Sequence, residues 1–236
     1  MAIQHLFDRA KVDYDEVYEA GKKAQQDEFW DSYQDYGQRQ QCNGLFAGVG
    51  WSKANFKPKY SMNNVYSALN MFWNSQIGGD LAELLEELGI KLTLNTGVNV
   101  NVMSMFTYSV FTRIPSLNLT KATNTSSMFA EMTKLVTIDE LIVSENTPFA
   151  SCFNSCSSLE NLKITGTIAK NGFNVQWSTK LSKASITSVI NALSTTTSGL
   201  TVTFSKTAVE TAFGSTTSQE WLALVATKSN WTISLV

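Results

Sequence analysis

Residues 126–143, SSMFAEMTKLVTIDELIV, and residues 150–165, ASCFNSCSSLENLKIT, carry the same pattern of side chains. In both stretches a phenylalanine is followed three residues later by a sulfur-containing residue, and then by leucine-like residues at short intervals. Equivalent phenylalanines recur along the chain at intervals of 34, 23 and 24 residues: Phe72, Phe106, Phe129 and Phe153. Because repeats of about 20 to 50 residues are typical of stacked units, the pattern predicts a solenoid.

The apolar residues between these phenylalanines also recur at fixed positions. One unit holds Phe111, Ile114, Leu117 and Leu119, the next holds Leu135, Ile138, Leu141 and Val143 at a constant spacing of 24, and Leu159, Leu162 and Ile164 continue with one residue fewer. We expect each unit to contribute a short strand and a returning segment, both with apolar residues inside. The predicted fold class is therefore α/β, a solenoid of parallel strands with helical or irregular returns.

Helix signals mark the longer first interval. Asp80 precedes LAELLEELG, with Glu83 as its capping-box partner and Gly89 as the helix end. The strand IKLTL, residues 90–94, follows with alternating burial. We place the repeats of this kind in residues 61–172.

The C-terminal part repeats the order of helix and strand. Its predicted elements are a helix capped by Ser182 over residues 182–193, a strand at 200–204, a helix from Ser205 to Gly214, a helix with a Thr217 and Glu220 capping box, and a last strand at 231–236. A solenoid must cover the apolar edge of its last unit. We therefore interpret residues 173–236 as C-terminal helix–strand repeats and a cap.

Residues 13–36 predict an N-terminal helix. Its last part carries aromatic residues on more than one face: Phe29, Trp30, Tyr33 and Tyr36. Two interpretations stay open, packing on the following domain and a docking or oligomerisation helix. Residues 37–61 contain several glycines and no sustained period, so they predict an irregular connector. We assign residues 1–60 to an attachment or oligomerisation segment with its connector.

Composition excludes several classes of function. Only 16% of the 236 residues are charged and the net charge is −2, so no basic field exists to recruit nucleic acid or an anionic membrane surface. No run reaches the ~18 apolar residues of a spanning helix. The first residues lack the basic start and apolar run of a Sec signal peptide. Three cysteines are too few for a disulfide framework, so we expect reduced thiols.

The sequence offers little for catalysis. The single histidine is His5, and the motifs of hydrolases, zinc proteases and nucleotide-binding proteins are absent. We interpret Cys152 and Cys156 as packed repeat residues, and the acids at 83, 86 and 87 as a solvated helix face. Asp139 and Glu140 are adjacent in a strand and should point to opposite faces, which would separate them. We therefore expect no catalytic residue, cofactor or metal ion.

The outward positions of the strands form a candidate binding face. They are Lys91, Thr93, Asn118, Lys163, Thr165, Thr201 and Thr203, with Ile142 among them. Their amides and hydroxyls can hydrogen-bond a glycan or a protein backbone, and aromatic residues at 51, 60, 66 or 73 can stack on a sugar ring. Polar outward residues are also what solubility requires, so each position has an ordinary structural explanation as well.

The units from about residue 62 to residue 170 resemble the BspA-type leucine-rich repeat family. Phe153, Cys156, Leu159, Leu162 and Ile164 match its pattern best, whereas Ser75, Ser109 and Met132 stand where the family prefers cysteine. The flanking stretches DEVYEAGKKAQQDEFWDSYQ and SQEWLALVATKSNWTISLV are similar to those of leucine-rich repeat proteins in phages and prophages of gut Firmicutes. The resemblance implies a leucine-rich repeat solenoid behind an N-terminal helix, and it brings no catalytic motif.

On these grounds we expect a non-enzymatic interaction protein, a tail or surface component of a phage virion. Residues 1–60 would contact virion neighbours or a second copy, and the repeats would contact a host-surface glycan or protein. Two alternatives remain: a virion-associated glycan-processing enzyme, and a bacterial surface adhesin or scaffold exported by a route other than Sec. Two carboxylates facing each other across ~5–10 Å in a cleft would favour the enzyme.

Overall fold

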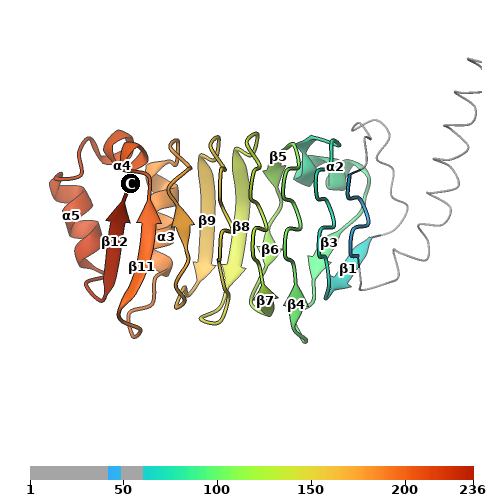
Figure 1. Ribbon diagram of the computed structural model, residues 1–236, viewed down its shortest axis with the longest axis horizontal. Helices are drawn as coiled ribbons and strands as arrows, with labels where there is room; N and C mark the ends of the chain where they lie inside the picture. Colours follow the sequence, from blue (N-terminus) through green and yellow to red (C-terminus); the bar gives the residue numbers. More distant parts are fainter. Residues whose placement is uncertain (1–41, 49–60) are drawn as a thin grey trace, which may run out of the picture.

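The computed structural model describes residues 42–48 and 61–236, and it shows a mixed α/β fold. The strands lie side by side along the long axis of the molecule, from β1 at one end to β12 at the other (Figure 1). All the strand pairs in these residues are parallel. Four helices accompany the strands: α2 near the first strands, and α3, α4 and α5 at the C-terminal end.

The strands are short and form four sheets. They are β1 Met62–Val65, β2 Gly79–Asp80, β3 Leu92–Leu94, β4 Val100–Asn101, β5 Phe111–Ile114, β6 Leu117–Asn118, β7 Ala122–Asn124, β8 Thr137–Val143, β9 Asn161–Gly166, β10 Asn174–Val175, β11 Leu200–Phe204 and β12 Trp231–Leu235. The largest sheet joins β2, β5, β8 and β6, with β9 also on β8. The others are β10-β11-β12, β1-β3 and β4-β7.

The strand register confirms the 24-residue spacing. Ile114 pairs with Ile138, and Leu117 pairs with Leu141. Between β8 and β9 the register shifts after the pair Ile138 and Leu162, as the missing residue in that unit predicted. The matched apolar residues are all buried, so successive units bury equivalent side chains next to one another.

The repeated phenylalanines form a continuous stack in the core. Neighbouring ring centroids are 5.3 Å apart for Phe72 and Phe106, 5.7 Å for Phe106 and Phe129, and 5.6 Å for Phe129 and Phe153. The stack begins one unit earlier than predicted, because Phe46 lies 5.0 Å from Phe72. Residues 42–48 therefore belong to the stack and not to an irregular connector.

The segments that carry these phenylalanines are turns held together by two sets of hydrogen bonds. Within a turn, Met71 N–H donates to the Ala68 carbonyl; between units, Phe72 N–H donates to the Met105 carbonyl. Each turn places two residues at positive φ, four apart, and the pairs are Gly44 and Gly48, Asn70 and Asn74, Ser104 and Tyr108, Ser127 and Glu131, and Ser151 and Ser155. The turns of successive units thus follow one backbone path.

Capping residues begin the helices close to the predicted positions. α2, Leu81–Glu87, starts after Asp80, whose carboxylate accepts from Glu83 N–H at 3.0 Å. α3, Lys183–Ala192, starts after Ser182, and α4, Lys206–Phe213, starts after Ser205 and ends at Gly214 with φ 78°. These caps confirm the predictions made from the sequence.

The cap of α5, Gln219–Ala226, was predicted one residue too early. Ser218, and not Thr217, is the N-cap, because its hydroxyl accepts from Trp221 N–H at 3.2 Å. Thr217 instead lies in the preceding turn, where its hydroxyl is 2.8 Å from that of Ser215. Two hydroxyl residues in succession made the choice ambiguous from sequence.

Helix α3 takes the place of a strand beside β9. Ser185 Oγ accepts from Leu162 N–H at 2.8 Å and donates to the Glu160 carbonyl at 2.8 Å. Ser188 Oγ accepts from Ile164 N–H at 2.9 Å. Serine hydroxyls one helical turn apart therefore satisfy strand groups that a further strand would otherwise pair.

The predicted N-terminal helix, with Phe29, Trp30, Tyr33 and Tyr36, lies outside the described residues, as do positions 51 and 60. Within the part of the chain that the structure describes, no helix has the length and apolar character needed to cross a membrane.

Candidate binding face

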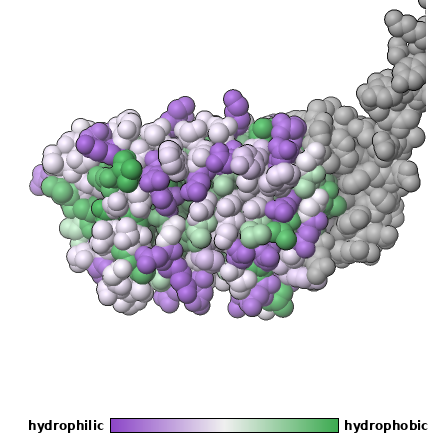
Figure 2. All heavy atoms as spheres, viewed as in Figure 1, coloured by the Kyte–Doolittle hydropathy of each residue, from purple (hydrophilic) through white to green (hydrophobic). Residues whose placement is uncertain are grey.

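The predicted face residues lie on the outer side of the strands, which we call the strand face. Lys91, Thr93, Lys163, Thr165 and Thr201 are exposed, and Asn118 and Thr203 are half-buried. Figure 2 shows hydrophilic side chains along the strands, a hydrophobic cluster at the end that holds α5 and β12, and smaller hydrophobic patches towards the opposite end. The predicted residues do not form one site, since they divide between two hollows and positions outside them.

The larger hollow, of about 360 Å³, is the strand groove, which joins residues from four strands and their loops. Its lining is Asn64, Leu92, Thr93, Leu94, Thr96, Ser116, Leu117, Asn118 and Ile142. The three leucines are buried, whereas Asn64, Thr93, Thr96 and Ser116 are exposed. The groove therefore combines an apolar interior with an uncharged polar rim.

Three hydrogen bonds orient groups in the strand groove. Asn64 N–H donates to Thr93 Oγ1 at 3.0 Å, with Asn64 at φ 56°. The Asn118 carboxamide oxygen accepts from Thr120 N–H at 3.0 Å and from the Thr120 hydroxyl at 2.6 Å. Because its oxygen is used in this turn, the Asn118 side chain has an NH2 group left as a hydrogen-bond donor.

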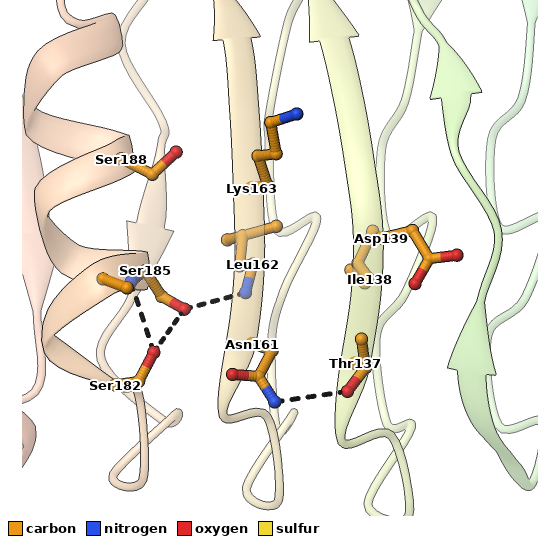
Figure 3. Close-up of a pocket in the computed structure, with 10 residues that line it drawn as sticks. Thr137, Ile138, Asp139, Asn161, Leu162, Lys163, Ser182, Ser185 and Ser188 are labelled. Atoms are coloured by element: carbon orange, nitrogen blue, oxygen red, sulfur yellow. Dashed lines mark hydrogen bonds between the residues drawn. The ribbon is translucent and has the colours of Figure 1, made fainter.

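The second hollow, of about 320 Å³, is the helix-side hollow, where β8 and β9 meet α3. Figure 3 shows Thr137 and Asp139 from β8, Asn161 and Lys163 from β9, Ser185 and Ser188 from α3, and the N-cap residue Ser182 around it. Asn161 Nδ2 donates to Thr137 Oγ1 at 3.4 Å. The Ser185 hydroxyl accepts from Leu162 N–H and donates to the Glu160 carbonyl. It therefore belongs to the hydrogen bonding of the sheet edge and is not available to a ligand in this hollow.

Several charged side chains on the strand face are paired across neighbouring strands. Arg113 on β5 binds Asp139 on β8 with two hydrogen bonds, of 2.7 and 3.1 Å, and Asp80 with a third of 3.1 Å. These two carboxylates raise the pKa of the Arg113 guanidinium. On the other side, Glu140 lies 2.8 Å from Lys163 and accepts from the Thr165 hydroxyl at 2.6 Å, and both contacts lower its pKa.

The prediction that Asp139 and Glu140 point to opposite faces was wrong. Both are partly exposed, because β8 places two residues between the inward-facing Ile138 and Leu141. β1 and β5 have the same pattern, two exposed residues between two buried ones. The register shift between β8 and β9 accommodates the extra residue. The two acids nevertheless bind different partners, on opposite neighbouring strands.

Several residues of these hollows were missed by sequence reasoning. Asn64, Thr96 and Ser116 complete the strand groove, and two serines of α3 with its N-cap serine complete the helix-side hollow. Asn64 stands in a repeated outward position, which the pattern of two exposed residues would have revealed. Lys91, Thr201 and Thr203 lie outside both hollows, and Thr165 is held by Glu140.

A third hollow, of about 230 Å³, contains the buried Lys228. Its ammonium group donates to the Asn191 carbonyl at 3.1 Å and to the Leu193 carbonyl, at the C-terminal end of α3. Burial lowers the pKa of this lysine. The bonded carbonyls account for its position, since a cation is favoured at a helix C-terminus, so Lys228 fastens the turn before β12 to α3.

The three cysteines form no disulfide bond, and all three are buried. Burial raises the pKa of the Cys42 thiol to about 11 and that of Cys152 to about 12. Since the thiolate is the nucleophile, these groups are poorly suited to react near neutral pH. Among the residues that the structure covers, no group of three or more histidine, cysteine or acidic side chains is arranged to hold a metal ion.

No family model, no curated protein and no solved structure matches this chain.

Proposed function

We propose that the protein is a non-enzymatic recognition module, a leucine-rich repeat solenoid of the BspA type that serves as a phage virion component. Its ligand is a neutral polar polymer on the host surface, a polysaccharide, which the strand groove binds. The parallel strands, the 24-residue register and the phenylalanine stack support the solenoid assignment. The virion assignment rests on the sequence resemblance of the flanking segments.

The observation that carries this proposal is the composition of the strand groove. Sugars present apolar C–H faces and many hydroxyl groups, so a groove with leucine inside and amides and hydroxyls at the rim is complementary to them. The groove lining contains no charged side chain, which favours an uncharged ligand over an acidic polymer or nucleic acid.

The geometry gives no specific support to a glycan-processing enzyme. Such enzymes need two carboxylates across a cleft. Of the three hollows described, the strand groove has no acid, the helix-side hollow has Asp139 and the third has Glu145. Asp139 is held by Arg113 and is not positioned as a free acid or nucleophile.

The test is binding of the full chain to cell envelopes of candidate Firmicutes hosts, before and after removal of surface polysaccharide. Ser116→Trp places an indole in the groove from an exposed position without a described hydrogen bond, and we expect at least a tenfold loss of binding. Thr201→Trp is the control, since Thr201 is also exposed but lies on β11, outside both hollows.

Binding that survives polysaccharide removal, or that Ser116→Trp leaves unchanged, would contradict a glycan ligand in the groove. Equal losses in Ser116→Trp and Thr201→Trp would show that the groove is not the site.

A further inference from the structure

The C-terminal end of the molecule leaves apolar side chains half-covered. In β11, Val202 and Phe204 are fully buried, whereas the residues that pair with them in β12, Ile233 and Leu235, are only half-buried. The difference arises because β11 has a strand on each side, while β12 pairs with β11 alone among the described residues. The inward side chains of β12 therefore lack the neighbouring strand that covers the same positions in β11.

The backbone of β12 also has a free edge. Val236 N–H donates to the Phe204 carbonyl at 3.1 Å, and Lys206 N–H donates to the Val236 carbonyl at 2.8 Å. Because alternate residues of a parallel strand face its neighbour, Thr232 and Ser234 also face β11. Ile233 and Leu235 then direct their N–H and C=O groups away from the sheet, where no described residue pairs them.

Helix α5 extends this uncovered surface. Leu222 is 50% exposed, and Leu224 and Val225 are half-buried. In Figure 2 the hydrophobic side chains gather over α5 and the tip of β12. Single exposed leucines are ordinary, but an apolar helix face beside an open strand edge is typical of an interaction surface.

Charge at this end is almost completely neutralised. β12 contains no charged residue and no proline, which are the usual means of protecting an edge strand. Lys228 is buried, and the charged residues of the neighbouring helices are paired, Lys183 with Glu220 at 2.5 Å and Lys206 with Glu210 at 3.7 Å. A two-fold axis brings any charge that lies near it close to its own copy, so an uncharged surface around the axis suits a self-association.

We propose that this end binds a second copy of the chain, through antiparallel pairing of the two β12 strands about a two-fold axis at Ile233. In this register Ile233 pairs with its own copy, and Leu235 pairs with Trp231 of the second chain. The outward groups of Ile233 and Leu235 match this arrangement, because hydrogen-bonded pairs recur at every second residue of an antiparallel ladder. Trp231 contributes its carbonyl, since its N–H already donates to the Lys228 carbonyl at 2.9 Å. The half-buried side chains of Ile233, Leu235 and α5 become covered at the same contact.

The register can be tested with paired cysteine variants of the full chain. Thr232 of one chain would lie opposite Ser234 of the other as a non-hydrogen-bonded pair, with Cα atoms about 4.5 Å apart, within disulfide range. We expect a mixture of Thr232→Cys and Ser234→Cys proteins to form a disulfide-linked dimer on mild oxidation. Each variant alone should cross-link far less, because the two copies of the same introduced cysteine would lie diagonally across the strand pair, with Cα atoms about 7–8 Å apart. Equal cross-linking in all three samples, or none, would overturn the proposal.

Sedimentation provides a second test that does not depend on cysteine chemistry. We expect the full chain to sediment with twice the 26.1 kDa mass of one chain at concentrations on the order of 10 µM, and Leu222→Glu to halve the observed mass. Val98→Glu is the control, because Val98 is 51% exposed in the loop before β4, away from this end. A monomeric wild-type chain, or a Leu222→Glu protein as large as Val98→Glu, would overturn the proposal.

Discussion

At the scale of single residues, the turns place ordinary side chains in a backbone conformation that favours glycine. Ser104, Tyr108 and Glu131 have φ of 52°, 61° and 60°, whereas the first unit has Gly44 and Gly48 at the corresponding places. A side chain with a Cβ in this region costs about 1–2 kcal/mol. The hydrogen bonds between successive turns offset that cost, because only one backbone path places every donor opposite a carbonyl of the next unit.

Ser151→Gly is expected to stabilise the protein by about 0.5–1 kcal/mol. Ser151 is exposed at φ 53°, so removing its Cβ relieves strain that exceeds the conformational entropy lost by glycine. Urea denaturation with a common slope measures the change. Ser157→Gly is the control: Ser157 is exposed at negative φ, and its replacement should destabilise by a similar amount. A loss of stability in Ser151→Gly would contradict the argument.

Sequence reasoning predicted the residues whose positions depend on burial. It failed where the backbone adopts positive φ or where a strand departs from strict alternation. The phenylalanine positions were predictable because a buried ring recurs in each unit. The positive φ of serine, tyrosine and glutamate was not predictable, since those side chains disfavour it. The placement of Asp139 and Glu140 failed for a related reason: strict alternation along a strand does not hold where two outward residues separate Ile138 from Leu141.

At the scale of elements, helix α3 covers the edge of β9 and supplies partners for backbone groups that would otherwise be unpaired. A helix has no free backbone donors or acceptors along its length, so it cannot extend a ladder with its own main chain. Ser185 and Ser188 supply hydroxyls instead, each both accepting from and donating to the edge of β9. The edge is thereby satisfied without a further strand.

Ser185→Ala is expected to cost about 1–3 kcal/mol, because it leaves the buried Leu162 N–H without a partner. Thermal and urea denaturation measure the loss, and hydrogen exchange should show faster exchange at the amide of Leu162. Thr187→Ala is the matched control on the same helix, where no described hydrogen bond is lost. If both variants unfold at the same urea concentration, the hydroxyl of Ser185 does not stabilise the edge.

Capping signals made most helix boundaries predictable, and they did not reveal what each helix covers. Asp80, Ser182 and Ser205 were recognised because an N-cap needs only local chemistry. The serines inside α3 resemble ordinary surface residues of a helix in the sequence. Their role becomes apparent only when the helix lies against β9, which is 23 to 24 residues away in the chain.

At the scale of the whole molecule, the core is a row of units in which each phenylalanine contacts its neighbours in the row. Phe129 stacks on Phe106 on one side and on Phe153 on the other. In such an arrangement stability is transmitted mainly between adjacent units. The strand groove depends on the same stacking, because it joins Asn64 to Ile142, and no local sequence pattern could have brought these residues together.

Phe129→Ala is expected to destabilise the protein by about 3–5 kcal/mol, since it leaves a cavity between two stacked rings. Hydrogen exchange should show the greatest loss of protection in the units of Phe106 and Phe153, and the least in β11 and β12. Phe213→Ala, at the far end of the molecule and 5.3 Å from Trp221, should give the reverse order. A uniform loss across the described residues in both variants would contradict transmission between neighbours.

The parallel strands follow one another at a regular spacing, so the number of strands sets distances along the molecule. β8 contributes Ile142 to the strand groove and Asp139 to the helix-side hollow, so the distance between the two hollows is counted in strands. Neighbouring strands are about 4.8 Å apart. A copy of the β8 unit inserted before β9 would leave Ile142 of β8 in the strand groove, supply its own equivalents of Thr137 and Asp139 to the helix-side hollow, and move the two hollows apart by one such step. Gain of a 24-residue unit in this way would change the spacing of the two hollows and keep the lining of each. The number of repeat units in the sequence would thus set the distance between the two hollows on the surface.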